Sequence, residues 1–271
     1  MTELQKEKYQ KLNDYMKKLG NVAIAYSGGV DSTFLLKVAK DILGNDNVMA
    51  ITVGGKTMSK REKNESDEFC REEAIKHIVL DVNEFDVEGF SENPKNRCYI
   101  CKKYLFGRII EAANANDIEY VLEGTNVDDI GDYRPGMQAI EELGVLSPLK
   151  ACGFTKQDIR DVSKELKLST WKKPSLACLA TRIPYGEIIT EEKLLMIDMA
   201  EQFLLDLGFS QVRVRMHDKL ARVEVQQEEI RRFMENEVRI KVVEKLKKIG
   251  FTYVAVDMSG YRTGSMNEDM K

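Results

Sequence analysis

The sequence has no apolar run long enough to cross a membrane, and its first residues, MTELQKEKYQ, lack the apolar core of a signal peptide. It also has no excess of positive charge, because 45 acidic residues outnumber 41 basic ones and the net charge is −4. A broad nucleic-acid-binding surface is therefore not expected, although a local basic patch is compatible with this balance. Internal repeats and low-complexity tracts are missing too. We expect a cytoplasmic globular protein with no membrane and no nucleic-acid partner.

Cysteines are few, and their use is informative. Five cysteines in a cytosolic chain of 271 residues do not indicate a disulfide framework. Cys70 falls in an expected helix and Cys152 in an expected loop, and we interpret both as structural. The other three are candidates for chemistry.

A glycine-rich turn near the start joins an expected strand, residues 21–26, to an expected helix with apolar residues at helical spacing. The turn consists of Ser27, Gly28, Gly29, Val30, Asp31 and Ser32. Its glycines let the backbone approach an anion, and the first-turn amides of the helix face that anion. The two serine hydroxyls can add donors, and Asp31 can hold a metal ion. No Gly-Lys-Ser/Thr closes the turn, so it is not a Walker A loop; an ordinary strand-to-helix turn is the simpler alternative.

This turn resembles the PP-loop of the ATP pyrophosphatases, a superfamily that includes NAD synthetases, GMP synthetases and tRNA thiolation enzymes. The resemblance implies that ATP is cleaved between its α and β phosphates and that a substrate is adenylated. A second stretch, which includes Gly124, Thr125 and Asn126, resembles the superfamily's motif beside the nucleotide. Asp128 and Asp129 follow it and are candidate magnesium ligands, because carboxylates near polyphosphate suit a hard cation. The alternative is an acidic turn that caps a helix.

The order of expected elements indicates an α/β fold. Strands alternate with helices over residues 1–170, which predicts a doubly wound parallel sheet with its ligand site at the carboxyl ends of the strands. Residues 171–188, with Pro174, Pro184 and Gly186, read as a connecting segment that carries Cys178. Residues 189–271 predict a smaller α+β domain that binds substrate. The expected strands are 21–26, 48–53, 77–82, 118–122, 211–216, 220–225 and 253–257, and the main expected helices are 3–19, 59–74, 99–113, 191–207, 228–234 and 237–249.

Charged residues alternate with apolar ones along the first two strands of the second domain. Arg213 and Arg215 share one face of the first strand, and Arg222 and Glu224 share one face of the second. With Arg262 near the end of the chain, these guanidinium groups are candidates to bind a ligand that carries phosphate and carboxylates. We expect Glu224 to orient them. A solvated charged strand face is the alternative.

Cys98 and Cys101 form a C-x-x-C pair at the start of an expected helix, where both thiols can reach the same ion or cluster. Alone, this pair is compatible with a redox pair, half a zinc site or a structural accident. Cys178 lies in a loop that has no need to bury a cysteine. Three thiolates suit a [4Fe–4S] cluster with one open iron, whereas structural zinc usually has four protein ligands and no fourth is evident. Arg182, close to Cys178, is placed to favour its thiolate or to bind a phosphate.

Together, the PP-loop, the Glu-Gly-Thr-Asn-Val-Asp-Asp stretch, the segment from Pro174 to Pro184 and the closing Gly-Tyr-Arg-Thr-Gly-Ser-Met-Asn resemble the LarE family over nearly the whole chain. The resemblance implies an enzyme that uses ATP and Mg²⁺ to adenylate a carboxylate of pyridinium-3,5-biscarboxylic acid mononucleotide. Sulfur then displaces AMP, and two rounds give the bisthiocarboxylic acid of the nickel-pincer nucleotide cofactor. It also implies a homo-oligomer.

In the best-studied members of the family, one cysteine at the position of Cys178 gives up its own sulfur and becomes dehydroalanine. This chain has Cys98 and Cys101 as well, and so resembles a subgroup in which a [4Fe–4S] cluster carries the donated sulfide. An unidentified sulfur donor is then needed to reload the cluster. Two alternatives stay open at this point: a PP-loop tRNA thiolation enzyme, and a nucleotide-binding regulator without catalysis.

Overall fold

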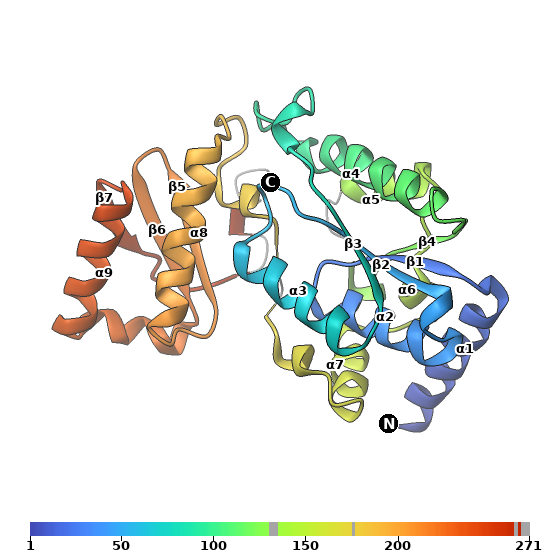
Figure 1. Cartoon of the computed structure of the whole chain (residues 1–271). Helices are drawn as coiled ribbons and strands as arrows, with labels where there is room; N and C mark the ends of the chain where they lie inside the picture. The colour runs from blue at the N-terminus through green and yellow to red at the C-terminus, as the bar shows by residue number, and fades with distance from the viewer. Residues whose placement is uncertain (130–134, 175–176, 263–264, 267–271) are drawn as a thin grey trace. The chain divides into compact units, whose positions relative to one another are not determined.

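The computed structural model describes residues 1–129, 135–174, 177–262 and 265–266 and is shown in Figure 1. The chain forms two compact units. The first comprises Met1–Glu88 and Asn96–Leu176, and the second comprises Gly89–Lys95 and Ala177–Lys271. None of the described helices is both long and apolar enough to cross a lipid bilayer.

The first unit is built on a four-stranded parallel sheet with the strand order β3-β2-β1-β4. Its strands are β1 (Val22–Ala25), β2 (Val48–Val53), β3 (Lys76–Leu80) and β4 (Val121–Leu122). The order changes direction at β1, because β2 and β3 lie on one side of it and β4 on the other. This is the switch point at which parallel sheets bind ligands, and the turn Ser27–Ser32 follows β1 directly. The predicted parallel α/β fold is confirmed.

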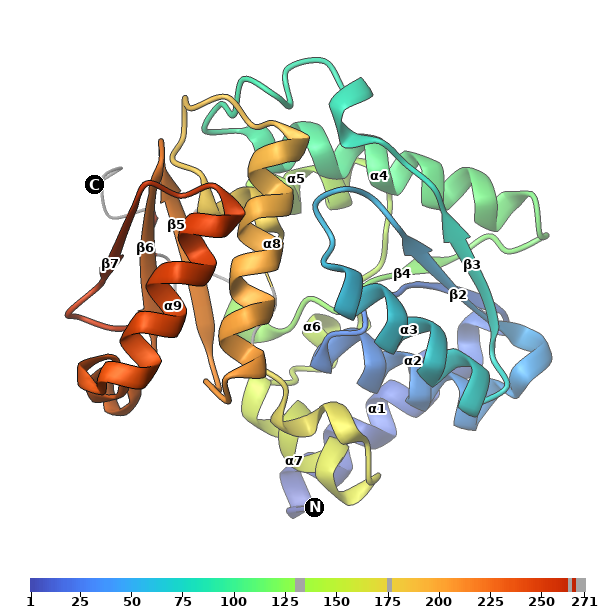
Figure 2. The ribbon, with the colours of Figure 1, turned by 60° about the vertical axis from the view of Figure 1, so that its left-hand side comes forward.

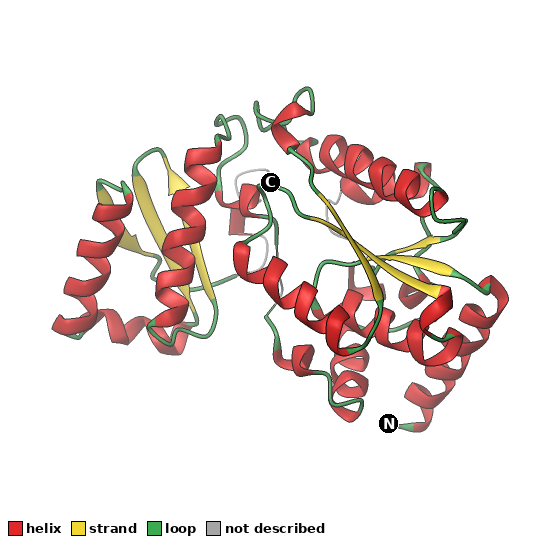
Figure 3. Cartoon of the chain, viewed as in Figure 1, coloured by secondary structure: helices red, strands yellow, loops and turns green. Residues whose placement is uncertain are grey.

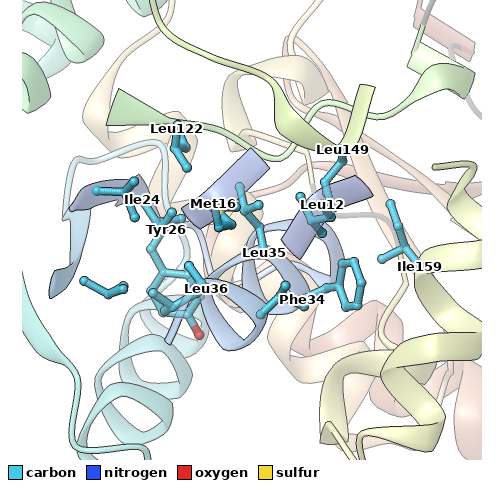
Figure 4. Packing of buried hydrophobic residues seen from close by; sticks show 14 of the residues in the cluster. Leu12, Met16, Ile24, Tyr26, Phe34, Leu35, Leu36, Leu122, Leu149 and Ile159 are labelled. Atoms are coloured by element: carbon cyan, nitrogen blue, oxygen red, sulfur yellow. The ribbon is translucent and has the colours of Figure 1, made fainter. Parts of the chain in front are cut away.

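Helices cover both faces of this sheet because its strands alternate between two apolar cores. Val22 and Ile24 face a core formed with α1 (Glu3–Leu19), α2 (Val30–Leu43), α3 (Lys60–Glu72) and α7 (Lys156–Glu165), part of which Figure 4 shows. Ala23 faces the opposite core, formed with α4 (Arg97–Asn114) and α5 (Pro135–Glu142). A short helix, α6 (Pro148–Ala151), precedes Cys152 in a segment for which no helix was expected.

The fourth expected strand, residues 118–122, is shorter in the structure, where β4 contains only Val121 and Leu122. The reason is the end of α4. Asp117 has a positive φ of 58°, and the amide of Ile118 donates to the carbonyl of Ala113, so Ile118 closes the helix instead of opening the strand. Glu119 lies between this cap and the strand, and the carbonyl of Tyr120 accepts a bond from the amide of Ala23.

The second unit is a three-stranded sheet packed against two helices. The strands β5 (Val212–His217) and β6 (Leu220–Val225) form an antiparallel hairpin, and β7 (Tyr253–Val256) adds in parallel to β6. Figure 3 shows these strands in yellow. The helices α8 (Glu191–Asp206) and α9 (Asn236–Ile249) lie side by side on one face of the sheet in Figure 2. The predicted small α+β region is confirmed, although the expected helix at 228–234 is a 3-10 helix, Gln227–Met234.

Residues Gly89–Lys95 belong to the second unit, whereas the sequence placed all of residues 1–170 in the first domain. Hydrogen bonds explain the difference. The side-chain amide of Asn93 donates to the carbonyls of Ile183 and Pro184, at 3.3 and 2.7 Å. The amide of Ile189 donates to the carbonyl of Ser91 at 2.8 Å. Such pairing across ninety residues leaves no local signal in the sequence.

Candidate active site

The turn after β1 has the strand–turn–helix geometry that the sequence predicted. Gly29 is the N-cap of α2, so the first-turn amides of this helix point toward the carboxyl edge of the sheet. The hydroxyls of Ser27 and Ser32 lie 3.1 Å apart, and the amide of Ser27 donates to the hydroxyl of Ser32 at 3.3 Å. The hydroxyls of the two serines thus lie together beside the main-chain amides of the turn. An anion can be bound there by main-chain and hydroxyl groups together.

Two glycines in this region are required by close approach. Gly28 has φ of +68°, and a Cβ at this position would lie 2.4 Å from the hydroxyl oxygen of Ser66 on α3. A Cβ on Gly124 would lie 3.0 Å from the amide nitrogen of Ser32 and 3.1 Å from Cβ of Asp31. The loop after β4 therefore packs directly on the first turn of α2. The structure brings the two sequence motifs together.

Asp31 is engaged by two side chains from distant segments. Its carboxylate forms an ion pair with the ammonium of Lys156, the first residue of α7, and accepts a bond from the side-chain amide of Asn126 at 3.4 Å. Lys156 was not singled out in the sequence. It supplies a positive charge beside the anion-binding turn.

The loop after β4 is fixed by its own polar residues. Glu123, which is buried, accepts bonds from the amide and hydroxyl of Thr125 at 3.0 and 2.7 Å, and another from the hydroxyl of Ser147. Asp129 accepts from the amide of Asn126 at 3.0 Å. Asp128 accepts from the amide of Lys156 at 2.7 Å and so helps to cap α7, which agrees with the alternative reading of an acidic turn that caps a helix.

These carboxylates suit Mg²⁺ only in part. In the described residues of either unit, no three His, Cys, Asp or Glu side chains converge as a metal site. Mg²⁺ bound to nucleotides, however, commonly takes one or two carboxylates and completes its shell with phosphates and water. Asp31 and Asp128 both contact Lys156, and so lie near each other beside the turn. These two residues fit that mode, and the role of Asp129 stays a prediction.

Three of the four charged residues on β5 and β6 in the second unit are buried, which disagrees with the solvated charged face considered as an alternative. Arg213, Arg215 and Glu224 are 6%, 5% and 0% exposed. In the hairpin, Arg213 lies opposite Glu224 and Arg215 lies opposite Arg222. Burial of this many charges requires partners or a bound ligand.

Arg215 has one charged and two polar partners, and one of its N–H groups has none among the described residues. Its guanidinium pairs with Glu224 at 2.9 Å and donates to the hydroxyl of Ser265 at 3.0 Å, while that hydroxyl donates to the other oxygen of Glu224 at 2.9 Å. A further bond runs to the carbonyl of Thr181 at 3.2 Å. The Nε of Arg215 is buried and has no hydrogen-bond partner among the described residues. A buried orphaned N–H is costly, and an anionic ligand would satisfy it.

Arg222 and Arg262 share a carboxylate. Arg222 pairs with Asp257 at 2.6 Å and with Glu224 at 3.4 Å, and Arg262 lies 3.6 Å from the other oxygen of Asp257. Burial opposes the ionisation of Asp257, but the amide of Ser259 and the guanidinium of Arg222 outweigh it, so the pKa of Asp257 lies below its usual value. Arg222 and Arg262 remain partly exposed.

Arg182 has a structural role, because its side chain hydrogen-bonds to the main chain of Cys178. It is 3% exposed and forms a bidentate pair with Glu201 of α8, with both bonds at 2.9 Å. Its Nη1 donates to the carbonyls of Ala177 and Cys178, at 2.6 and 3.1 Å. Burial opposes the ionisation of Glu201, but Arg182 and Arg213 outweigh it and the pKa of Glu201 is lowered. The guanidinium thus holds the backbone on which the Cys178 thiol is carried.

Charged side chains gather in the second unit. They are the guanidinium groups of Arg182, Arg213, Arg215, Arg222 and Arg262 and the carboxylates of Glu201, Glu224 and Asp257. A guanidinium group can bind a phosphate or a carboxylate through two parallel hydrogen bonds.

The five cysteines, all of them among the described residues, form no disulfide. Cys98 and Cys101 lie in the first turn and a half of α4, three residues apart and so on one side of the helix. The guanidinium of Arg97 donates to the sulfur of Cys98 at 3.6 Å. Cys178 belongs to the second unit and is exposed. Cys70 and Cys152 are buried, and burial raises the pKa of Cys70 to about 12 and that of Cys152 above its usual value. These last two fit the predicted structural role.

Sequence reasoning missed several residues of these sites. Lys156 is the first residue of α7, and nothing in the surrounding sequence indicates that its side chain reaches Asp31 in the turn Ser27–Ser32. In the sequence, nothing distinguishes Glu201 from the other acidic residues of its expected helix. Ser265 and Asp257 come from the end of the chain, and their contacts with the hairpin depend entirely on tertiary folding.

Comparison with known proteins agrees with this geometry. The family model described as NAD synthase matches residues 4–127. An uncharacterized protein of Synechocystis sp. is 40% identical over 96% of this chain and 97% of its own, and one of Methanocaldococcus jannaschii is 29% identical over 93% and 95%. The pyridinium-3,5-bisthiocarboxylic acid mononucleotide synthase of Lactiplantibacillus plantarum is 33% identical over 94% of this chain and 92% of its own. The chain therefore belongs to the LarE family, which are ATP-using sulfurtransferases built on a PP-loop domain.

Proposed function

We propose that the protein adenylates a carboxylate of pyridinium-3,5-biscarboxylic acid mononucleotide with ATP and replaces AMP by sulfur, in the synthesis of the nickel-pincer nucleotide cofactor. The observation that carries this proposal is the pair of buried guanidinium groups on β5, Arg213 and Arg215, with the Nε of Arg215 lacking a hydrogen-bond partner among the described residues. Such a site suits a small ligand that bears a phosphate and carboxylates. The PP-loop and the L. plantarum relative support the ATP-dependent step.

In the first step a carboxylate oxygen of the substrate attacks the α-phosphorus of ATP, and pyrophosphate leaves. The charge that builds on pyrophosphate would be stabilised by the amides of the Gly28–Ser32 turn, the hydroxyls of Ser27 and Ser32 and the ammonium of Lys156. Asp31 and Asp128 would hold Mg²⁺, which neutralises phosphate charge when bound. Gly124, Thr125 and Asn126 would line the nucleotide opposite this turn.

In the second step a sulfur nucleophile attacks the acyl carbon, and AMP leaves with the electron pair of the broken C–O bond. Arg213, Arg215, Arg222 and Arg262, with Glu224 to orient them, would hold the substrate phosphate and its second carboxylate. Two rounds convert both carboxylates to thiocarboxylates.

Cys98, Cys101 and Cys178 are thiol donors of the type that a [4Fe–4S] cluster requires. When bound, the cluster would supply the sulfide, and an unidentified donor would replace it after each round. Arg182 would fix the Cys178 segment through its main-chain bonds. The alternative is that Cys178 gives up its own sulfur.

Iron and sulfide analysis of protein purified anaerobically separates these two cases. We expect roughly four irons per chain, lost on Cys98→Ala, Cys101→Ala or Cys178→Ala. Colourless wild-type protein without iron after reconstitution, with Cys178 losing its sulfur in one turnover by mass spectrometry, would establish the sacrificial alternative. Turnover stimulated by tRNA and not by the pyridinium mononucleotide would instead show a tRNA thiolation enzyme.

A further inference from the structure

The peptide unit between Gly28 and Gly29, in the anion-binding turn, has little steric restraint of its own. Gly28 has φ of +68° and Gly29 has φ of −78°, and neither residue carries a side chain. A peptide flanked by two glycines can rotate about its neighbouring bonds at low steric cost. Its orientation is therefore set by the groups that contact its carbonyl oxygen and its N–H.

The N–H of this peptide faces the hydroxyls of the turn. The amide of Gly29 donates to the hydroxyl of Ser27 at 3.4 Å, and that hydroxyl lies 3.1 Å from the hydroxyl of Ser32. A hydrogen bond of this length is weak, so an anion can replace it. Because the carbonyl and the N–H of a trans peptide point in opposite directions, the carbonyl of Gly28 points away from these hydroxyls.

Lys173 contacts that carbonyl. Its ammonium donates to the carbonyl oxygen of Gly28 at 2.8 Å and forms an ion pair with Glu65 of α3 at 2.5 Å. The Lys173 side chain is 13% exposed, so water screens these contacts little. Burial opposes the ionisation of Glu65, but Lys173 and Arg61 outweigh it and the pKa of Glu65 is lowered. Glu65 is therefore a carboxylate at neutral pH, and it holds the ammonium at the carbonyl of Gly28.

The main chain at Lys173 is fixed as well. The guanidinium of Arg160, on α7, donates to the carbonyl of Trp171 at 2.6 Å and to that of Lys173 at 2.9 Å. Lys172, in contrast, is exposed, and its ammonium lies over the ring of Trp171, 4.8 Å from the centroid. All of these residues, like the turn itself, belong to the first unit. Of two adjacent lysines, one contacts the turn and the other lies on the surface.

We propose that Lys173 is a positioning residue for ATP binding, which fixes the peptide between Gly28 and Gly29 with the Gly29 amide toward the phosphates. This inference rests on the proposed function, because it requires that the turn binds the pyrophosphate end of ATP. Lys173 acts through the peptide and not on the reacting atoms. Without Lys173, the peptide can rotate so that the carbonyl oxygen of Gly28, and not the N–H of Gly29, faces the anion.

The test compares Lys173→Met with Lys172→Met, which removes the same charge one residue away. The dissociation constant of α,β-methylene-ATP with Mg²⁺ is measured by calorimetry on the full chain, and this needs no turnover. For Lys173→Met we expect the constant to rise roughly tenfold or more, the scale of one lost hydrogen bond to a charged group. Lys172→Met should match wild type. Lys173→Arg, which can donate to the same carbonyl, should recover most of the affinity.

A second pair of variants separates positioning from simple charge attraction. Glu65→Met removes the anion that contacts Lys173, so charge attraction alone predicts tighter binding of the nucleotide. Positioning predicts the opposite, because the ammonium of Lys173 loses the carboxylate that holds it. We therefore expect the dissociation constant to rise roughly two- to fivefold. Glu68→Met removes an exposed carboxylate from the same helix and should not raise the constant.

The outcomes are separable. Unchanged binding in Lys173→Met, or tighter binding in Glu65→Met, would overturn the inference. Should Lys173→Met unfold, the direction of the change in Glu65→Met still decides between positioning and charge attraction. Pyrophosphate exchange into ATP with the pyridinium mononucleotide tests the proposed function separately. Wild-type protein that binds the analogue without exchange would refute the proposed function and leave the comparison of dissociation constants valid, whereas wild-type protein that does not bind the analogue would overturn the inference.

Discussion

Lys156 and Asp31 form an ion pair across 125 residues of sequence, at the first turn of two different helices. The pair places a cation beside the anion-binding turn at the carboxyl end of β1. Because the same lysine's amide binds Asp128, one residue of α7 contacts both acidic side chains of the candidate magnesium site.

Replacement of Lys156 should slow adenylation, the step that consumes ATP. Lys156→Met removes the charge beside the turn and leaves Asp31 without its cation, so we expect pyrophosphate exchange to fall by roughly tenfold or more, the scale of a hydrogen bond to a charged group. Lys164→Met, which removes an exposed ammonium from the same helix, is the matched control. Exchange at the wild-type rate in Lys156→Met would show that this lysine does not act on the nucleotide.

A single methyl group should disable the turn. In Gly124→Ala the new Cβ would lie 3.0 Å from the amide nitrogen of Ser32, and the loop or the first turn of α2 must shift. We expect loss of pyrophosphate exchange in a folded protein. Gly107→Ala is the control, because no atom lies within 4 Å of its Cβ and it sits inside α4. It should raise stability by about 0.5–1 kcal/mol in a denaturant melt. Normal exchange in Gly124→Ala would contradict the close packing of the two motifs.

Cysteine reactivity should separate structural from functional thiols. Burial raises the pKa of Cys70 to about 12, so its thiolate fraction at pH 8 is on the order of one in ten thousand. In cluster-free protein we expect iodoacetamide to label the exposed Cys178 well before Cys70, with peptide mass spectrometry as the measurement. Labelling of Cys70 at the same rate would show that α3 opens readily.

The buried pair of Arg182 and Glu201 should carry a pH-dependent part of the stability. Glu201→Gln removes the carboxylate that pairs with the buried Arg182 guanidinium, a change that costs roughly 3–5 kcal/mol at pH 7. The pKa of Glu201 in the folded protein lies below its unfolded value of 4.5. The contribution of Glu201 to the free energy of unfolding is therefore complete above pH 4.5 and disappears as the pH falls through the folded pKa. In urea unfolding, the difference in the free energy of unfolding between wild type and Glu201→Gln should therefore become smaller below pH 4.5. A difference that stays constant with pH would contradict the lowered pKa of Glu201.

Local patterns predicted the elements and the turn at Ser27–Ser32, because a strand, a helix and its cap are encoded by neighbouring residues. The bounds of β2 and β6 agree with those predictions. Long-range partners could not be predicted in this way. The bonds from Lys156 to Asp31 and from Ser265 to Glu224 depend on how distant segments fold together. The alternation in β5 and β6 indicated a charged face, but burial of that face is set by the segment at Thr181 and by the chain end.

The central claim is that ATP is spent to activate a pyridinium carboxylate for attack by sulfur. The most direct measurement incubates anaerobically prepared protein with Mg²⁺-ATP and pyridinium-3,5-biscarboxylic acid mononucleotide, and follows AMP and the mass of the pyridinium product together. The account predicts that AMP appears only with this substrate, and that the product exchanges one oxygen for one sulfur per AMP formed. AMP without any sulfur in the product of the reconstituted enzyme, or no AMP at all, would contradict it.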